Sequence, residues 1–114
     1  MSMKITLPCY TFLYQRHVWG KVGIGTSFER LQAKTVVTCS EPEVVRYENW
    51  YVVVLPILYN GSEHLIMIES IDDDLKALAR HCITSKDDSE RKEILTRMRT
   101  RLLRYSERTL TFVA

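Results

Sequence analysis

Residues 50–69 read WYVVVLPILY, then NGS, then EHLIMIE. Two apolar runs, rich in β-branched and aromatic residues, flank the pair Asn60-Gly61. Both residues tolerate the positive φ angles that a type I′ turn requires at its two central positions. The stretch therefore predicts a β-hairpin, and we expect the rest of the chain to pack against it.

After Glu69 the apolar residues recur at helical rather than strand spacing. Ser70 or Asp72 can cap a first helix over about 72–83, and the acidic residues of its first turn favour the positive end of the helix dipole. A second amphipathic helix is predicted over about 89–106, after the capping residue Asp87. The residues expected to face inward are Leu75, Leu78, Ala79 and Cys82 in the first helix and Ile94, Leu95, Met98, Leu102 and Tyr105 in the second.

The chain before the hairpin predicts short strands. Residues 4–14 alternate as one strand, with Ile5, Leu7, Cys9, Thr11 and Leu13 on one face and an interruption at Pro8. A glycine-punctuated strand follows at 21–27, then a short helical turn at 27–33 and a strand at 34–39. For 40–49 two alternatives stay open, a short helix capped by Ser40 and Glu43 or a loop. The segment 109–113 alternates as a last short strand.

Together these elements predict an α+β fold in a single domain, 1–114. It is a mostly antiparallel sheet of five to six short strands around the central hairpin (50–69). The two C-terminal helices pack on one face of that sheet.

The composition is that of a soluble globular protein. The chain is 46% hydrophobic and 26% charged, close to globular averages. Its longest apolar run, 50–59, is half the length of a membrane-spanning helix. With no secretory signal and three scattered cysteines (Cys9, Cys39 and Cys82), we expect a cytoplasmic or nuclear, reducing location. We expect no cofactor, metal or small-molecule substrate, because no zinc spacing or phosphate loop is present.

The basic residues are concentrated near the C-terminus. Residues 86–114 carry eight basic and five acidic side chains, whereas residues 1–85 carry eight and nine. At offsets of 0, 4, 7 and 11, four arginines share one face of the second helix: Arg97, Arg101, Arg104 and Arg108. Such a row could bind a nucleic-acid backbone or an acidic protein partner. It could equally be a solvated helix face.

The first arm of the hairpin is a candidate contact surface. It is apolar at almost every position, which is typical of a strand buried on both faces. Yet it contains Pro56, which strands tolerate at edges or bulges. A bulge would resolve the conflict, and so would an edge covered by a second copy of the chain. The residues expected to support self-association are Trp50, Val52, Val54, Leu55 and Pro56.

Residues 21–31, KVGIGTSFERL, resemble the second strand and following helix of the GIY-YIG nuclease family. The resemblance covers about twenty residues and matches Tyr10 or Tyr14, Gly23 and Arg30, the last as the catalytic arginine. It implies a metal-binding glutamate on a later helix. The chain departs from that pattern by continuing into the hairpin, so Glu43 or Glu48 would have to serve.

Other titratable residues have simpler interpretations. Cys82 is expected in the core, and His64 is expected to be an exposed strand residue opposite Leu58 or Tyr59. No catalytic set converges in the sequence. We therefore expect a non-enzymatic protein-interaction module, homodimeric or a subunit of a larger assembly, such as a small viral or phage accessory protein or an adaptor-like subunit. The alternative is a nucleic-acid-binding accessory protein that uses the arginine row, and a more remote one is a GIY-YIG-like nuclease.

Overall fold

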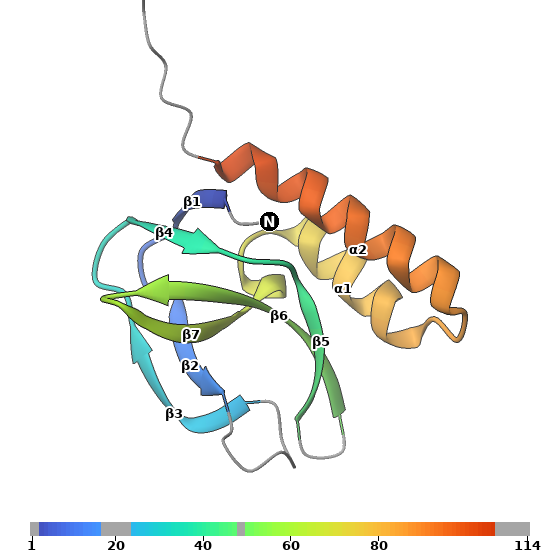
Figure 1. Ribbon diagram of the computed structural model, residues 1–114, viewed down its shortest axis with the longest axis horizontal. Helices are drawn as coiled ribbons and strands as arrows, with labels where there is room; N and C mark the ends of the chain where they lie inside the picture. Colours follow the sequence, from blue (N-terminus) through green and yellow to red (C-terminus); the bar gives the residue numbers. More distant parts are fainter. Residues whose placement is uncertain (1–2, 17–23, 48–49, 107–114) are drawn as a thin grey trace, which may run out of the picture.

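The computed structural model describes residues 3–16, 24–47 and 50–106, and it confirms the α+β class (Figure 1). Two helices, α1 (Asp73–Thr84) and α2 (Asp88–Leu102), lie beside an antiparallel sheet. Two single turns of 3₁₀ helix, η1 (Ile68–Ser70) and η2 (Leu103–Tyr105), follow the last strand and α2. The strands are β1 (Met3–Leu7), β2 (Phe12–Arg16), β3 (Ile24–Arg30), β4 (Thr35–Cys39), β5 (Glu43–Tyr47), β6 (Trp50–Tyr59) and β7 (Ser62–Met67).

Strand β6 is the centre of the sheet. The strand order is β1-β4-β6-β7-β2-β3, with β5 also paired to β6. β7 follows one edge of β6 over residues 54–59. The other edge is shared, since β5 pairs with residues 50–54 and β4 with Ile57 and Leu58. The expected hairpin is therefore the hub to which the other strands are added.

Pro56 lies where β6 changes partners. Ile57 is opposite Cys39, and Val54 is opposite Glu43. Three residue steps along β6, from 54 to 57, therefore lie opposite four residue steps along the neighbouring segment, from 43 back to 39. The extra residue is a bulge between β4 and β5, a place where a residue without an N–H is tolerated. The Pro56 carbonyl still accepts a hydrogen bond from the Ser40 N–H, at 3.0 Å. The conflict raised by the sequence is thus resolved within one chain.

The turn after β6 has the predicted geometry. Asn60 and Gly61 have φ angles of 51° and 77°, as a type I′ turn requires. A Cβ added to Gly61 would meet nothing within 4 Å, so the glycine is needed there for its backbone conformation rather than for space.

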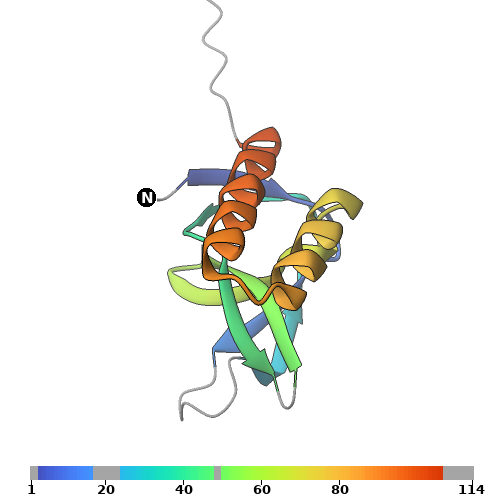
Figure 2. The same ribbon diagram turned by 90° about the vertical axis from the view of Figure 1, so that its right-hand side faces the viewer.

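The main hydrophobic core lies between the sheet and the helices. Figure 2 shows α1 and α2 side by side against the sheet. Their buried residues are Leu75, Ala79 and Cys82 in α1 and Ile94, Met98 and Leu102 in α2, all members of the predicted inward sets. Of the two capping residues that the sequence offered, Ser70 and Asp72, it is Asp72 that caps α1, its side chain accepting from the Leu75 N–H at 2.7 Å. The second helix ends at Leu102, about one turn before the expected 106.

A smaller hydrophobic cluster, which we call the second cluster, lies on the opposite face of the sheet. Val54 and Leu65 are fully buried there, with Tyr14, Val45, Val52 and Met67 packed against them. Val53, Leu55 and Ile57 belong to the main core. β6 therefore contributes to a core on both faces, which accounts for its nearly continuous apolar sequence.

Two expectations for residues 27–49 are wrong. Residues 27–30 of the expected helical turn belong to the strand β3, and the helix or loop expected at 40–49 contains β5, whose Val44 and Val45 face Val53 and Val52 across the ladder. Such β-branched pairs favour a strand over the local capping signal.

The single strand expected at 4–14 is two strands separated by a turn. In that turn Tyr10 has a φ of 66°, and the Thr11 Oγ1 donates to the Pro8 carbonyl at 2.8 Å. Because the turn breaks the alternation, Cys9 is exposed rather than inward. The strand predicted at 109–113 lies outside the described residues.

Neither α1 nor α2, the two α-helices of the described residues, has the length and apolar character needed to cross a membrane.

Candidate binding surfaces

The residues expected to support self-association differ in how far they are buried. Leu55 and Val54 have no exposed surface, and Pro56 is also buried, so these three belong to the interior of the single chain. Val52 is half-buried against the second cluster. Trp50 is the exception, with 68% of its surface exposed. Of the five expected residues, Trp50 is therefore the one with most of its surface exposed.

The exposed end of β6 carries a second aromatic residue that the sequence did not single out. Tyr51 is 54% exposed, and its strand partner is Arg46. Because successive strand residues face opposite sides, Trp50 and Tyr51 project from opposite faces of the β5–β6 hairpin. Val44, also exposed, shares the Tyr51 face. We call Val44, Trp50 and Tyr51 the tip surface. Figure 1 shows these two strands extending beyond the helices.

A small cavity lies between the tip surface and the helices. It has a volume of about 240 Å³ and is lined by Val44, Tyr51, Cys82, Ile83 and Arg91. Burial raises the pKa of the Cys82 thiol, which keeps the sulfur neutral and unreactive. The lining of the cavity therefore includes aliphatic and aromatic side chains together with one arginine.

The arginine row of α2 is largely paired with carboxylates. Arg97 binds Glu93 at 3.0 Å in an exposed pair. Arg101 binds Asp72 and Asp74, each at 3.0 Å, and is only 21% exposed. Arg104 is exposed and has no ion pair with a described residue, while Arg108 lies outside the described residues.

Asp72 joins the start of α1 to the end of α2. Besides capping α1, it accepts hydrogen bonds from the Arg101 guanidinium and the Tyr105 hydroxyl. Burial by itself raises the pKa of Asp72, but the hydrogen bonds from Tyr105, from the Leu75 N–H and from Arg101 outweigh it, so the pKa is lowered. The central arginine of the row is thus part of a structural clamp between the helices.

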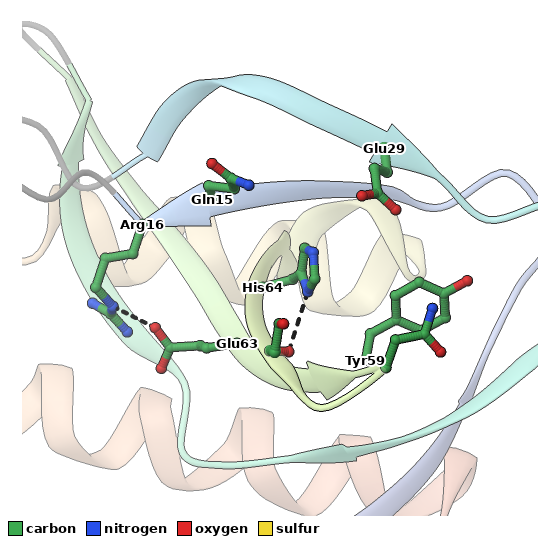
Figure 3. Close-up of a pocket in the computed structure, with 8 residues that line it drawn as sticks. Gln15, Arg16, Glu29, Tyr59, Glu63 and His64 are labelled. Atoms are coloured by element: carbon green, nitrogen blue, oxygen red, sulfur yellow. Dashed lines mark hydrogen bonds and ion pairs between the residues drawn. The ribbon is translucent and has the colours of Figure 1, made fainter.

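A polar pocket opens beside the turn of the central hairpin. It has a volume of about 400 Å³ and is lined by Gln15, Arg16, Glu29, Tyr59, Asn60, Ser62, Glu63 and His64. Figure 3 shows Gln15, Glu29, His64 and Tyr59 around one opening, contributed by β2, β3, β7 and β6. Such a volume lies within the range typical of small-molecule sites.

His64 is the most buried polar residue of that pocket. It is 8% exposed and lies opposite Ile57, so the expectation of an exposed residue opposite Leu58 or Tyr59 is wrong. Its Nδ1 lies 3.2 Å from the Ser62 carbonyl, which can only accept, so Nδ1 is the donor. Its ring packs edge-on against Tyr59, with centroids 5.8 Å apart.

The other side of the pocket is a charged cluster. Arg16 donates to Glu63 at 2.9 Å and to Glu43 at 2.8 Å (Figure 3 draws the Glu63 bond). These hydrogen bonds, that of Glu63 first, raise the pKa of the Arg16 guanidinium further above its ordinary value. One cation is therefore shared by two carboxylates.

Of the described residues matched to the GIY-YIG family, Tyr10 and Arg30 contact each other, whereas Tyr14 and Glu43 make other contacts. The Arg30 guanidinium lies 5.1 Å from the centre of the Tyr10 ring, at the end of a strand rather than on a helix. Tyr14 packs in the second cluster and Glu43 pairs with Arg16. Gly23 and Glu48 lie outside the described residues.

The described part of the chain has no group of side chains suited to bind a metal ion. Within 3–16, 24–47 and 50–106, no three His, Cys, Asp or Glu side chains are grouped so as to hold a metal ion.

Comparison with known proteins adds no relative, since no family model, curated protein or solved structure matches the chain. Its candidate sites therefore rest on its own residues.

Sequence reasoning missed Tyr51 and the polar pocket. A signal for Tyr51 was present, because it lies in the same apolar run as Trp50. The pocket had no local signal, because its residues come from four strands that are distant in sequence.

Proposed function

We propose that this chain is a non-enzymatic protein-interaction module that forms a homodimer through the tip surface. The observation that supports it is the exposure of Trp50 and Tyr51 at one end of a strand whose middle is fully buried. Large aromatic residues are enriched in the cores of protein interfaces and dominate their energetics.

The tip supplies both a protruding group and a receptor for it. Trp50 projects from one face, and the cavity beside Tyr51 opens on the other. Val44 and Ile83 give that cavity apolar walls, and Arg91 can stack its guanidinium on an indole ring. In the proposed dimer, Trp50 of each copy enters the cavity of the other. Contacts of this reciprocal kind close a two-fold symmetric pair.

The test is the mass of the protein in solution. Light scattering after size exclusion at micromolar concentration is expected to give a dimer for the wild type and a monomer for Trp50→Ala with Tyr51→Ala. Leu103→Ala is the matched control, because Leu103 is an exposed apolar residue on η2 that lies outside the tip surface. A wild-type mass that is strictly monomeric, or a dimer that survives the double substitution, would contradict the proposal.

A further inference from the structure

The polar pocket beside the central turn has a chemical character that the proposed dimer does not use. It shares no residue with the tip surface or with the cavity beside it. We propose that this pocket binds a guanidinium cation, carried either by an arginine side chain of a peptide or by a small molecule.

The first argument is the charge of the lining. Glu29 makes no ion pair with another described residue, and Glu63 shares Arg16 with Glu43. The lining thus carries two carboxylates, Glu29 and Glu63, against one guanidinium, and that guanidinium is shared with Glu43 outside the lining. An unbalanced negative charge in a recess favours a positively charged ligand.

The second argument is the hydrogen-bonding state of His64. Its Nδ1 donates to the Ser62 carbonyl, so Nε2 of the neutral ring is an acceptor. No hydrogen bond from a described residue reaches Nε2. Among the described residues no fully enclosed side-chain nitrogen or oxygen lacks a partner, so Nε2 keeps some accessible surface, and His64 is a lining residue of the pocket. The pocket lining therefore offers an acceptor nitrogen from His64 and a carboxylate from Glu29, which together suit a ligand with several N–H donors.

The third argument is the shape of the matching group. A guanidinium is planar, carries five N–H donors and binds carboxylates in a bidentate manner. Glu29 from β3 and His64 from β7 can accept from it on two sides, and Tyr59 supplies an aromatic wall (Figure 3). The molecule already holds a guanidinium in this way, since Arg16 lies between two glutamates on the same rim. A phosphate or carboxylate ligand would meet repulsion from Glu29 and Glu63.

The experiment is an NMR titration of the ¹⁵N-labelled chain with two guanidinium probes. Agmatine represents a small-molecule ligand, and acetyl-Gly-Arg-Gly-amide represents a peptide. We expect saturable shifts at Ser62, Glu63 and His64, with a dissociation constant of about 1 mM for ligands of this size. Tighter binding of one probe identifies the source of the cation.

Charge dependence is tested with paired ligands and paired variants. The citrulline analogue of the peptide keeps the shape without the charge and is expected not to bind. Glu29→Gln should weaken binding by about tenfold or more, because it removes a charge-assisted hydrogen bond. Glu69→Gln removes an equal charge from η1, away from the pocket lining, and should leave binding unchanged. Three outcomes would overturn the assignment. The citrulline peptide could bind as tightly as the arginine peptide, or Glu69→Gln could weaken binding as much as Glu29→Gln does. The third is the absence of saturable chemical-shift changes up to about 10 mM ligand.

Discussion

The two halves of β6 have nearly the same kind of sequence and opposite environments. Residues 53–57 are buried, with the helices on one face and the second cluster on the other. Residues 50 and 51 pair with β5 and carry two large aromatic side chains that remain exposed. An apolar run therefore specifies a strand, while the elements packed over it decide which part is core. The part left uncovered is the natural candidate for an intermolecular contact.

The largest expected effect is at the centre of the buried half. Leu55→Asp would place a carboxylate in the main core and remove a buried leucine, a combined cost of at least about 5 kcal/mol. Since small domains are stabilised by about 5–15 kcal/mol, most of the protein should be unfolded. Far-UV circular dichroism and urea unfolding measure this directly.

Leu58→Asp provides the control on the same strand. Leu58 is exposed, so the identical substitution should change the free energy of unfolding by less than about 1 kcal/mol. A folded, monomeric Leu55→Asp protein would break the comparison, because it would make the middle of β6 a contact surface instead of core.

An intermediate effect is expected where the helices are clamped over the buried half. Asp72→Ala removes the α1 cap and the main partner of Arg101, and should lower the free energy of unfolding by about 2–3 kcal/mol. Asp72→Asn can still cap the helix and should lose less. Urea unfolding of the two variants beside the wild type separates the cap from the ion pair.

The same clamp gives a pH dependence with a defined sign. The pKa of Asp72 is lowered below its ordinary 3.8 in the folded protein, so the carboxylate contributes stability that is fully present above that value. This contribution is lost as the pH falls through the folded pKa. Wild-type stability should therefore fall more steeply below pH 3.8 than that of Asp72→Asn. Parallel acid curves for the two proteins would exclude the clamp.

The smallest effect is expected at the exposed end. Trp50→Ala should change the free energy of unfolding of the monomer by no more than about 0.5 kcal/mol, the usual range for surface substitutions. Thermal unfolding at low protein concentration, where a dimer dissociates, is the appropriate measurement. A loss of several kcal/mol there would show that Trp50 stabilises the monomer, and would remove the contrast between the two halves.

The second half of the fold was predictable because short-range interactions determine its elements. The Asn60-Gly61 turn, the Asp72 cap and the apolar stripes of both helices depend on residues within a few positions of one another. The errors fall where long-range pairing overrides local preference. The segment 40–49 carries a capping pattern, yet Val44 and Val45 become a strand because β6 offers a ladder to join.

The candidate sites were less predictable than the fold. Trp50 was identified from its apolar run, but its neighbours Leu55 and Pro56 prove to be interior. Arg101 has the spacing of a binding row, and only the position of Asp72, 29 residues away, shows that it is already paired. The pocket around His64 is assembled from four strands, so no short segment could reveal it.

The sequence by itself determined the class of the fold, the central hairpin and its turn, and the inward faces of the two helices. These follow from periodicity and backbone preference, which act over a few residues. Only the tertiary structure decided which half of β6 is covered, which arginines are paired and where a recess remains. Those outcomes depend on elements far apart in the chain meeting in space, and periodicity contains no information about such distances.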